Sequence, residues 1–505
     1  MSVDNPASIT VHIPTAKAIC YKQRNIVAVK HTLDSARVLR NLGLNAPSPM
    51  LYDGFVFGGR YEPMIHQTKT AEFLTLNRRA FVFNTMGTGK TAAALWTLDY
   101  LKQRGHIKKI LIIAPLSVMD VWVNEAFSVI PQWSFNQLVG KRERRISLLN
   151  AGADVCVINY DGLVSIQEEI EDWKPDLVIV DEADAYCNPQ TKRYEALKNT
   201  LKVDTRLWLL TGTPVPNAPT DAYGLIKLVD PSKLPASFKL FQETLMYKRG
   251  PYKWYPKPGA EDRVFELMQP AIRFTKKDCL DLPPITYNSR KCAMSQEQQT
   301  VFDNVKNAMK HEDRDAGIEI KAVNAAVKLI KLQQIMCGVV KDSNGDPVML
   351  NPKDRLEQVD EIIAGAEAKV IIFVPFVNVM HLVKDHLEKR YGVELVNGDV
   401  KKTERDEIFS RFQHDDKLRV LVAHPKVAAH GLTLTAANTI IWYAPTFSIG
   451  QYLQANARIE RKGQKLAMSI YHLWCHPVEA AIYTLLQTRE SLQSRVMELY
   501  DEMVA

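Results

Sequence analysis

Short runs of apolar residues recur along the chain and fall into two series. Each run is four or five residues long, too short for a helix, and is rich in Val, Ile, Leu or aromatic residues. Amphipathic stretches separate the runs, which is the pattern of buried parallel strands joined by helical crossovers. The pattern therefore predicts two α/β halves. The first series is Ala80–Phe83, Ile110–Ala114, Val155–Ile158, Leu177–Val180 and Leu207–Leu210, and the second is Val370–Val374, Val420–Ala423, Thr439–Trp442 and Ser469–Leu473.

The stretches outside the two series differ from them in residue composition and pattern. Residues 230–290 carry many prolines, glycines and aromatic residues, which predicts irregular connections around a few helices, ending near a hinge at Leu282–Pro284. Residues 295–337 have a helical pattern of Ala, Val and Leu with frequent Lys and Gln. Near the start of the chain, Ile26–Val29 resembles a strand, and Thr32–Leu42 resembles a helix that ends at a glycine.

Composition narrows the class of protein. Apolar residues make up 46% of the 505 residues and charged residues 24%, which is ordinary for a globular protein of several domains. The net charge of +7 is compatible with a polyanionic partner. Seven scattered cysteines, without a C-x-x-C pair, indicate reduced thiols and no structural zinc. With no signal peptide and no apolar run of about 20 residues, we expect a cytoplasmic protein (in the host cytoplasm if phage-encoded) with no membrane partner.

A glycine-rich loop follows the first apolar run and opens an alanine-rich helix, Ala92–Leu101. Backbone N–H groups of such a loop and of the helix N-terminus surround phosphate groups. Lys90 would reach the terminal phosphates, and the Thr91 hydroxyl would bind Mg²⁺. The sequence therefore predicts an ATP site with Mg²⁺. The predicted loop residues are Gly87, Thr88, Gly89, Lys90 and Thr91.

This loop departs from the full G-x-x-x-x-G-K-[ST] pattern, because Asn84 stands where the first glycine is expected. The alternative interpretation is a chance glycine turn before a helix. The strand–loop–helix context favours the phosphate site.

A second motif, which is acidic, lies at the end of the run Leu177–Val180. The carboxyl end of a strand is where α/β proteins place ligands. Asp181 would hold Mg²⁺, directly or through water, and Glu182 would orient or deprotonate the attacking water. The alternative is an acidic cap between a strand and a helix. Together with the phosphate loop, the motif predicts ATP hydrolysis, with Lys90, Asp181 and Glu182 as catalytic residues.

Several motifs in order, from about residue 60 to about residue 494, resemble the superfamily-two helicases and, within them, the Swi/Snf-like DNA translocases. The motifs are Tyr61–Gln67, Ala114–Ser117 with Trp122, Ile158–Asp161, Leu210–Pro214, Leu282–Pro284, His430–Ala437, Gln454–Gln464 and Val478–Ile482. The resemblance implies two RecA-like parallel-sheet domains in tandem with a nucleotide cleft between them. It implies a first domain over 59–280, a second over 281–505 with a C-terminal helix, and a small N-terminal module of unknown role over 1–58.

The resemblance also implies roles for individual residues. Gln67 would read adenine, Gly431 would contact the nucleotide, and Arg458 and Arg461 would be the arginines that reach ATP and stabilise charge on the transferring phosphoryl group. The spacing of Arg458 and Arg461 alone indicates a pair on one helix face, typically a solvated surface pair, but the order of the motifs favours the roles at ATP. Ala457 and Glu460 depart from the glycine and histidine that are usual before the two arginines.

DNA would be held by its phosphates, so binding should depend on salt and little on base sequence. The resemblance makes Ala114–Ser117 and Ile158–Asp161 DNA-contacting motifs. The motif match assigns phosphate contacts to Ser117, Thr213, Thr433 and Thr435. In the basic segment 247–257, Trp254 and Tyr255 could stack on bases while lysines neutralise phosphates. The alternative for this segment is a proline-stiffened loop packed on the first domain.

The compact chain resembles bacterial and phage-encoded motors of this group. We therefore expect an ATP-dependent DNA helicase or translocase that acts on duplex or branched DNA in replication, recombination or repair, with single-stranded DNA as a further substrate. One alternative is an RNA helicase, which the letters Asp-Glu-Ala-Asp at 181–184 suggest and the Thr-Gly-Thr motif at 211–213 opposes. Another is an ATP-gated DNA-binding subunit of a larger complex.

Overall fold

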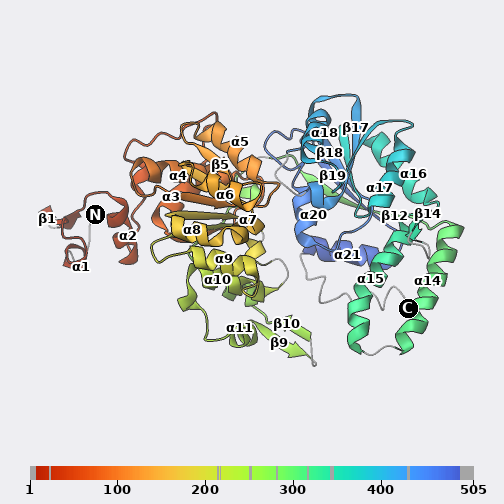
Figure 1. Ribbon diagram of the computed structural model, residues 1–505, viewed down its shortest axis with the longest axis horizontal. Helices are drawn as coiled ribbons and strands as arrows, with labels where there is room; N and C mark the ends of the chain where they lie inside the picture. Colours follow the sequence, from red (N-terminus) through yellow and green to blue (C-terminus); the bar gives the residue numbers. More distant parts are fainter. Residues whose placement is uncertain are drawn as a thin grey trace. The chain divides into compact units, whose positions relative to one another are not determined.

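The structure is a computed structural model that describes residues 7–21, 24–212, 215, 218–249, 253–279, 282–315, 318–341, 346–428 and 433–488 (Figure 1). The chain forms two compact units. The first comprises Met1–Val215 and Pro219–Cys279, and the second comprises Pro216–Ala218 and Leu280–Ala505. In the described part of the chain, no helix combines the length and the apolar character needed to cross a membrane.

The first unit is built on a seven-stranded sheet with the order β11-β3-β8-β7-β4-β6-β5, in which every neighbouring pair is parallel. All five predicted strands of the first series are present. The strands are β3 Arg79–Val82, β4 Ile110–Ile113, β5 Phe135–Gln137, β6 Val155–Ile158, β7 Leu177–Asp181, β8 Arg206–Leu210 and β11 Ala271–Ile272.

Helices cover both faces of this sheet because alternate residues of each strand point to opposite sides. In β7, Leu177 and Ile179 belong to one buried cluster, and Val178 and Val180 belong to another. The first face contacts α3 Ile65–Leu76, α4 Lys90–Gln103 and α5 Met119–Val129. The second face contacts α6 Arg142–Leu149, α7 Tyr160–Ser165, α8 Gln167–Trp173, α9 Lys192–Thr200 and α10 Ala222–Val229.

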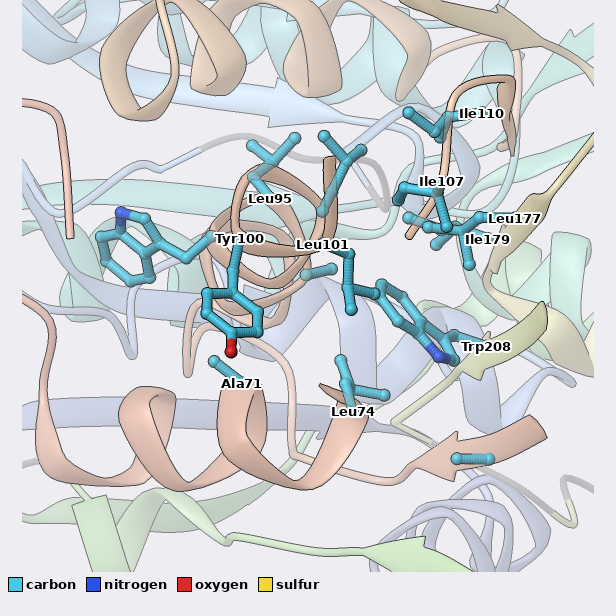
Figure 2. Packing of buried hydrophobic residues seen from close by; sticks show 14 of the residues in the cluster. Ala71, Leu74, Leu95, Tyr100, Leu101, Ile107, Ile110, Leu177, Ile179 and Trp208 are labelled. Atoms are coloured by element: carbon cyan, nitrogen blue, oxygen red, sulfur yellow. The ribbon is translucent and has the colours of Figure 1, made fainter. Parts of the chain in front are cut away.

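The helix that follows the phosphate loop lies at the centre of the first cluster. Figure 2 shows Tyr100 of α4 directed toward Ala71 of α3, with Leu101 and Leu74 close to Trp208 of β8. Burial on this scale contributes about 1.5–3 kcal/mol per large apolar side chain. The start of α4, and with it the loop, is therefore held in a rigid position.

The N-terminal segment contains α1 Ala7–Thr10, β1 Lys17–Tyr21, β2 Arg24–Ala28 and α2 Leu33–Asn41. Strands β1 and β2 form an antiparallel pair. The Thr32 hydroxyl caps α2 by accepting a hydrogen bond from the Ser35 backbone N–H over 3.2 Å. Buried residues of this segment, such as Leu33, join the same cluster as α3 and α4. Its role as a separate module stays a prediction.

The proline-rich stretch after α10 is more regular than expected. It contains the expected helices, α11 Phe238–Leu245, α12 Ala260–Leu267 and α13 Lys276–Cys279. It also contains an unpredicted antiparallel hairpin, β9 Met246–Arg249 and β10 Lys253–Pro256, and it supplies the edge strand β11. Strands were missed here because prolines at 251, 256 and 258 suggest breaks, whereas Pro256 is the last residue of β10 and Pro258 follows that strand.

The second unit has a six-stranded sheet with the order β12-β19-β18-β15-β17-β16, again parallel throughout. The two parallel-sheet α/β halves predicted from the sequence are thus confirmed. The strands are β12 Ile285–Lys291, β15 Lys369–Phe373, β16 Gly392–Val396, β17 Leu418–Ala423, β18 Ala437–Trp442 and β19 Met468–Trp474, and a separate pair is formed by β13 Val339–Lys341 and β14 Pro347–Met349.

Helices cover both faces of the second sheet as well. One buried cluster contains side chains of α16 Lys353–Gly365 and α17 Val377–Leu387. The other contains side chains of the predicted helical stretch and of the later helices. These are α14 Gln296–Asp315, α15 Ile318–Met336, α18 Lys402–His414, α20 Ile449–Asn456 and α21 Pro477–Thr488.

Candidate functional site

The predicted ATP-site residues of the first unit gather at one edge of its sheet. Strand β8 lies between β3 and β7, and Leu210 pairs in register with Val82 on one side and Asp181 on the other. Because parallel strands end at the same edge, the loop after β3 and the acidic turn after β7 share that edge. Strands β4 and β6 end there too, which brings the segments after Ile113 and Ile158 to the same edge.

The glycines of the loop are required by its shape. Gly87 and Gly89 have φ values of 83° and 76°, in the left-handed region that favours glycine. A Cβ at Gly89 would lie 2.0 Å from Nε2 of Gln67, so a side chain there would displace the Gln67 amide from the loop. Gly89 is the N-cap of the 14-residue helix α4. Free backbone N–H groups of a helix N-terminus attract anions, and the cradle therefore fits a phosphate group.

Two side chains of α3 contact the backbone of the phosphate loop. Gln67 Nε2 donates to the Thr88 carbonyl over 3.4 Å, and His66 Nε2 lies 2.7 Å from the same oxygen. The Gln67 side chain also accepts a hydrogen bond from the Met64 N–H over 2.9 Å. The structure thus places Gln67 against the phosphate loop, and its reading of adenine stays a prediction. Sequence reasoning missed His66, which is buried and adjacent to the glutamine.

The departure at Asn84 has a structural reason. Its buried side chain donates to the Thr70 hydroxyl over 2.9 Å and accepts a hydrogen bond from the Phe274 N–H over 2.9 Å. Its backbone carbonyl accepts a hydrogen bond from Lys90 Nζ over 2.8 Å. Asn84 therefore ties the loop to α3 and to the segment after β11, and a glycine there would lose both side-chain contacts.

Asp181 ends β7 in a buried position. Its Oδ2 accepts a hydrogen bond from Trp122 Nε1 over 2.8 Å, and its Oδ1 accepts one from the Glu182 N–H over 3.0 Å. Burial raises the pKa of Asp181, while the Trp122 hydrogen bond and the charge of Lys90 act against this increase. Glu182 adopts a left-handed backbone conformation, with φ of 48°. The chain therefore turns at Glu182, directly after Asp181.

Tyr160 connects this turn to the segment after β6. Its hydroxyl donates to the backbone carbonyls of Asp181 over 2.7 Å and of Glu182 over 3.2 Å. The guanidinium of Arg193 lies 5.7 Å from the centre of the Tyr160 ring and forms an ion pair with Asp161. The motif predicted to contact DNA is thus hydrogen-bonded to the motif predicted to act on ATP.

Asp184 was not among the predicted site residues. Burial raises its pKa from the ordinary 3.8 to about 6, and the nearby Asp181 carboxylate adds to the increase. The Thr211 hydroxyl donates to Asp184 Oδ1 over 3.3 Å, which links the turn after β7 to the end of β8. The signal that could have found it is an acid three residues beyond the strand end, on the same turn as Asp181.

The donors at this edge fit a magnesium ion that is held mainly by phosphate oxygens and water. Within the described residues, no group of three or more His, Cys, Asp or Glu side chains could hold a metal ion. Mg²⁺ in nucleotide sites keeps several waters and uses one or two protein oxygens. Each Asp181 carboxylate oxygen accepts one hydrogen bond from the residues above and has a second lone pair, so Asp181 retains the capacity to bind such an ion.

In the second unit, the structure brings together the residues before β18 and β19. Arg461 Nη1 donates to the Thr433 hydroxyl over 3.1 Å. The Thr435 hydroxyl accepts a hydrogen bond from Gln413 over 3.2 Å. Gln464 Nε2 donates to the carbonyl of Ala437 over 2.8 Å, so that it joins both segments. Sequence reasoning assigned no role to Gln464 beyond its place in the motif.

The alternative that the spacing of Arg458 and Arg461 offered, a solvated pair on one helix face, does not hold in the structure. Helix α20 ends at Asn456, and both arginines lie in the turns that follow. Arg458 is 3% exposed, its Nε donates to the Gln454 carbonyl, and its carbonyl accepts a hydrogen bond from Leu434 N–H. Burial lowers the pKa of Arg461 to about 10. Both cations are held by backbone contacts rather than projecting freely into water.

The other predicted residues are distributed as follows. Thr213 and Gly431 lie outside the described residues. Ser117 is half-buried after β4, at the same edge as the phosphate loop. Trp254 and Tyr255 lie on β10 of the unpredicted hairpin, away from the sheet edge.

Known proteins match most of the chain. The family described as SNF2-related domain matches residues 66–339, and the family described as Helicase conserved C-terminal domain matches residues 354–463. YqhH of Bacillus subtilis, an uncharacterized ATP-dependent helicase, is 27% identical, over 88% of this chain and 81% of YqhH. YwqA of the same organism is 26% identical over 83% of this chain and 46% of YwqA, so the chain spans about half of YwqA. The Sulfolobus solfataricus SWI2/SNF2 ATPase core in complex with double-stranded DNA matches at 24% identity with a TM-score of 0.42, over 88% of this chain and 96% of that chain.

Proposed function

The chain belongs to the family of SNF2-related domains, and from this membership we propose that it hydrolyses ATP and couples the hydrolysis to movement along DNA. The observation that carries the proposal is the shared sheet edge of the first unit. Parallel register brings the glycine cradle, Lys90 and the Asp181 turn to one edge, and Tyr160 links that turn to the segment after β6.

In this proposal the residues of the first unit have distinct tasks. The cradle from Gly87 to Gly89 binds the phosphates through backbone N–H groups. Lys90 leaves the Asn84 carbonyl and neutralises the terminal phosphates. Asp181 and Thr91 hold the magnesium ion, which supplies positive charge to the phosphate oxygens when it is bound. Glu182 orients the attacking water.

We propose that Arg458 and Arg461 stabilise the negative charge on the transferring phosphoryl group. Arginine suits this task because it stays charged even when buried. The hydrogen bond between Arg461 and Thr433 supports a link between this role and the proposed phosphate contact of Thr433. Because of this hydrogen bond, a change in the position of Thr433 would also change the position of Arg461.

ATP turnover tests the proposal directly. The rate is measured with single-stranded DNA, duplex DNA, four-way junctions and single-stranded RNA, and Lys90→Ala serves as the blank. We expect strong stimulation by duplex or junction DNA and none by RNA. Stimulation by RNA alone would contradict the DNA assignment. If no nucleic acid raises the rate, the chain is instead a subunit whose ATP site depends on a protein partner.

For the DNA substrate, we propose branched structures of the kind met in replication, recombination and repair. The support is the similarity to YqhH, which is a helicase by name and of which this chain covers 81%. The test is branch migration of a labelled four-way junction with ATP and with a non-hydrolysable analogue. Movement of the branch point only with ATP is expected, and equal products with the analogue would contradict it.

A further inference from the structure

The β9–β10 hairpin presents two different surfaces to its surroundings. Directly opposed residues of an antiparallel pair share a face, and the faces alternate along each strand. Met246 pairs with Pro256, and Lys248 pairs with Trp254. Met246 is 6% exposed, and Trp254 packs against the buried cluster that covers the second face of the first sheet. This face of the hairpin therefore attaches it to the first unit.

The other face carries a tyrosine pair. Tyr247 pairs with Tyr255 in register, and their rings are nearly parallel, with centroids 5.9 Å apart and an angle of 22° between planes. Tyr247 is 44% exposed. The Tyr247 ring is therefore accessible to a ligand, and the half-buried Tyr255 ring stacks on it.

The base of the hairpin is firmly held. The Lys257 N–H donates to the Leu245 carbonyl over 2.9 Å, at the end of α11, and Lys257 Nζ donates to the carbonyl of Glu243. Figure 1 shows the hairpin beyond α10 and α11, at the margin of the first unit and away from the sheet. Residues 250–252, between β9 and β10 in the sequence, lie outside the described residues. The aromatic pair is thus on a fixed element and not on a loose loop.

The charge of the segment points to the chemistry of its partner. Residues 246–257 contain four basic residues and no acidic residue, namely Lys248, Arg249, Lys253 and Lys257. An accessible aromatic ring within a basic segment matches single-stranded nucleic acid, because bases stack on such a ring while cations neutralise the phosphates. A duplex offers no such match, since its bases are already stacked within the helix.

We propose that the Tyr247–Tyr255 pair is a stacking site for an unpaired DNA base at a fork or junction, separate from the site where the motor holds duplex. The inference rests on the proposed function and adds a second DNA site to it. Trp254, which the sequence suggested as a stacking residue, instead supports the hairpin from its inner face. Tyr247 takes its place as the residue that a base contacts.

Binding measurements with two matched DNAs test this site. Fluorescence anisotropy gives the Kd for a forked DNA with unpaired arms and for a blunt duplex with the same paired region. Stacking contributes about 1–3 kcal/mol per base, which corresponds to about 5- to 150-fold in Kd. We expect Tyr247→Ala/Tyr255→Ala to weaken fork binding by such a factor and to change duplex binding by less than about twofold. Equal losses on both DNAs, or no loss on the fork, would overturn the inference.

Three control variants separate stacking from other causes. Tyr247→Phe/Tyr255→Phe keeps the rings and should bind the fork as the wild type does, because the hydroxyls take no part in stacking. Tyr52→Ala removes another exposed tyrosine of the first unit, which is 66% exposed, and should have no effect. Thermal unfolding of the alanine variant should match the wild type. A loss of fork binding in the phenylalanine variant or in Tyr52→Ala would contradict the assignment.

The experiment also separates this inference from the proposed function. Duplex-stimulated ATP turnover of the wild type reports on the motor, and the ratio of fork to duplex affinity reports on the hairpin. If duplex fails to stimulate turnover, the motor assignment falls while the affinity ratio still tests the stacking site. If turnover is stimulated and the ratio does not change in the alanine variant, only the stacking site is rejected.

Discussion

Each unit buries a cluster of charged side chains, and the two clusters are built in opposite ways. In the second unit, Arg355 and Glu479 form an ion pair of 2.8 Å with side chains 1% and 0% exposed. Arg355 also donates to the Cys475 thiol over 3.0 Å and to the Tyr443 carbonyl. In the first unit, the buried Asp181 lies near the half-buried Asp184, and the nearby cation Lys90 donates to a backbone carbonyl.

The pKa directions express this difference. Burial alone would lower the pKa of Arg355, but the charges of Cys475 and Glu479 outweigh burial and raise it. In the first unit burial raises the pKa of both aspartates, and Lys90 only partly opposes it. A buried charge is therefore not a functional signal by itself. Two like charges without full compensation are suited to receive a cation, whereas a matched pair is suited to hold a fold together.

Removal of one partner of the matched pair should give the largest effect. Arg355→Ala leaves Glu479 buried without its cation, which costs about 3–5 kcal/mol of unfolding free energy. Chemical denaturation followed by circular dichroism would measure the loss. The double variant Arg355→Met/Glu479→Leu removes both charges and should lose much less. If the double variant is as unstable as the single one, the pair does not act through charge matching.

The same type of change in the first unit should affect turnover and not stability. Asp181→Asn keeps the shape and removes one of two like charges, so the unfolding free energy should stay equal or rise. ATP turnover should fall by about 100-fold or more, because the substitution removes the carboxylate that holds the magnesium ion in the proposed function. Glu479→Gln is the matched control, with lower stability and normal turnover per folded molecule. A stability loss without a turnover loss in Asp181→Asn would remove the contrast between the clusters.

The pH dependence of stability should also distinguish the units. The pKa of Asp184 is raised to about 6 in the folded state, so the folded protein holds a proton that the unfolded chain releases between about pH 4 and 6. The stability contributed by this group is present below that window and is lost as pH rises through it. Its full size is about 3 kcal/mol.

Unfolding of the wild type and of Asp184→Asn between about pH 5 and 7.5 measures this contribution as a difference. We expect the wild type to gain stability relative to the variant as the pH falls. If the unfolding free energies of the two proteins change with pH in parallel, the pKa of Asp184 is not raised in the folded state.

Much of this arrangement could be predicted from the sequence, and the reason is periodicity. Buried strands such as Val155–Ile158 are uninterrupted apolar runs, and parallel register then places the motifs after them at one edge. The edge strand β12 was missed because most of its residues are exposed and polar, so no apolar run marks it. The roles of Asn84 and Phe274 were also hidden, because 190 positions separate them along the chain.

Side-chain environment was the other limit. The spacing of Arg458 and Arg461 suggests one helix face, and only the end of α20 at Asn456 shows that the pattern does not apply. The raised pKa of Asp184 depends on burial against neighbours that are distant in sequence. Trp254 and Tyr255 are adjacent in the sequence and belong to opposite faces of the hairpin, and only the pairing with β9 shows that Trp254 shares the face of the buried Met246.

The smallest expected effect concerns Tyr160, whose hydroxyl holds the backbone of the acidic turn and not its charges. Tyr160→Phe should cost about 0.5–1.5 kcal/mol of stability and lower kcat for ATP by about 2- to 10-fold, since Glu182 loses part of its support. Tyr483→Phe deletes the same group in the second unit, where the hydroxyl donates to the Trp442 carbonyl over 3.0 Å. That variant should lose similar stability with an unchanged kcat. A lower kcat in both variants would mean that turnover follows general stability, whereas a decrease in Tyr160→Phe alone would identify Tyr160 as a positioning residue between the DNA motif and the ATP motif.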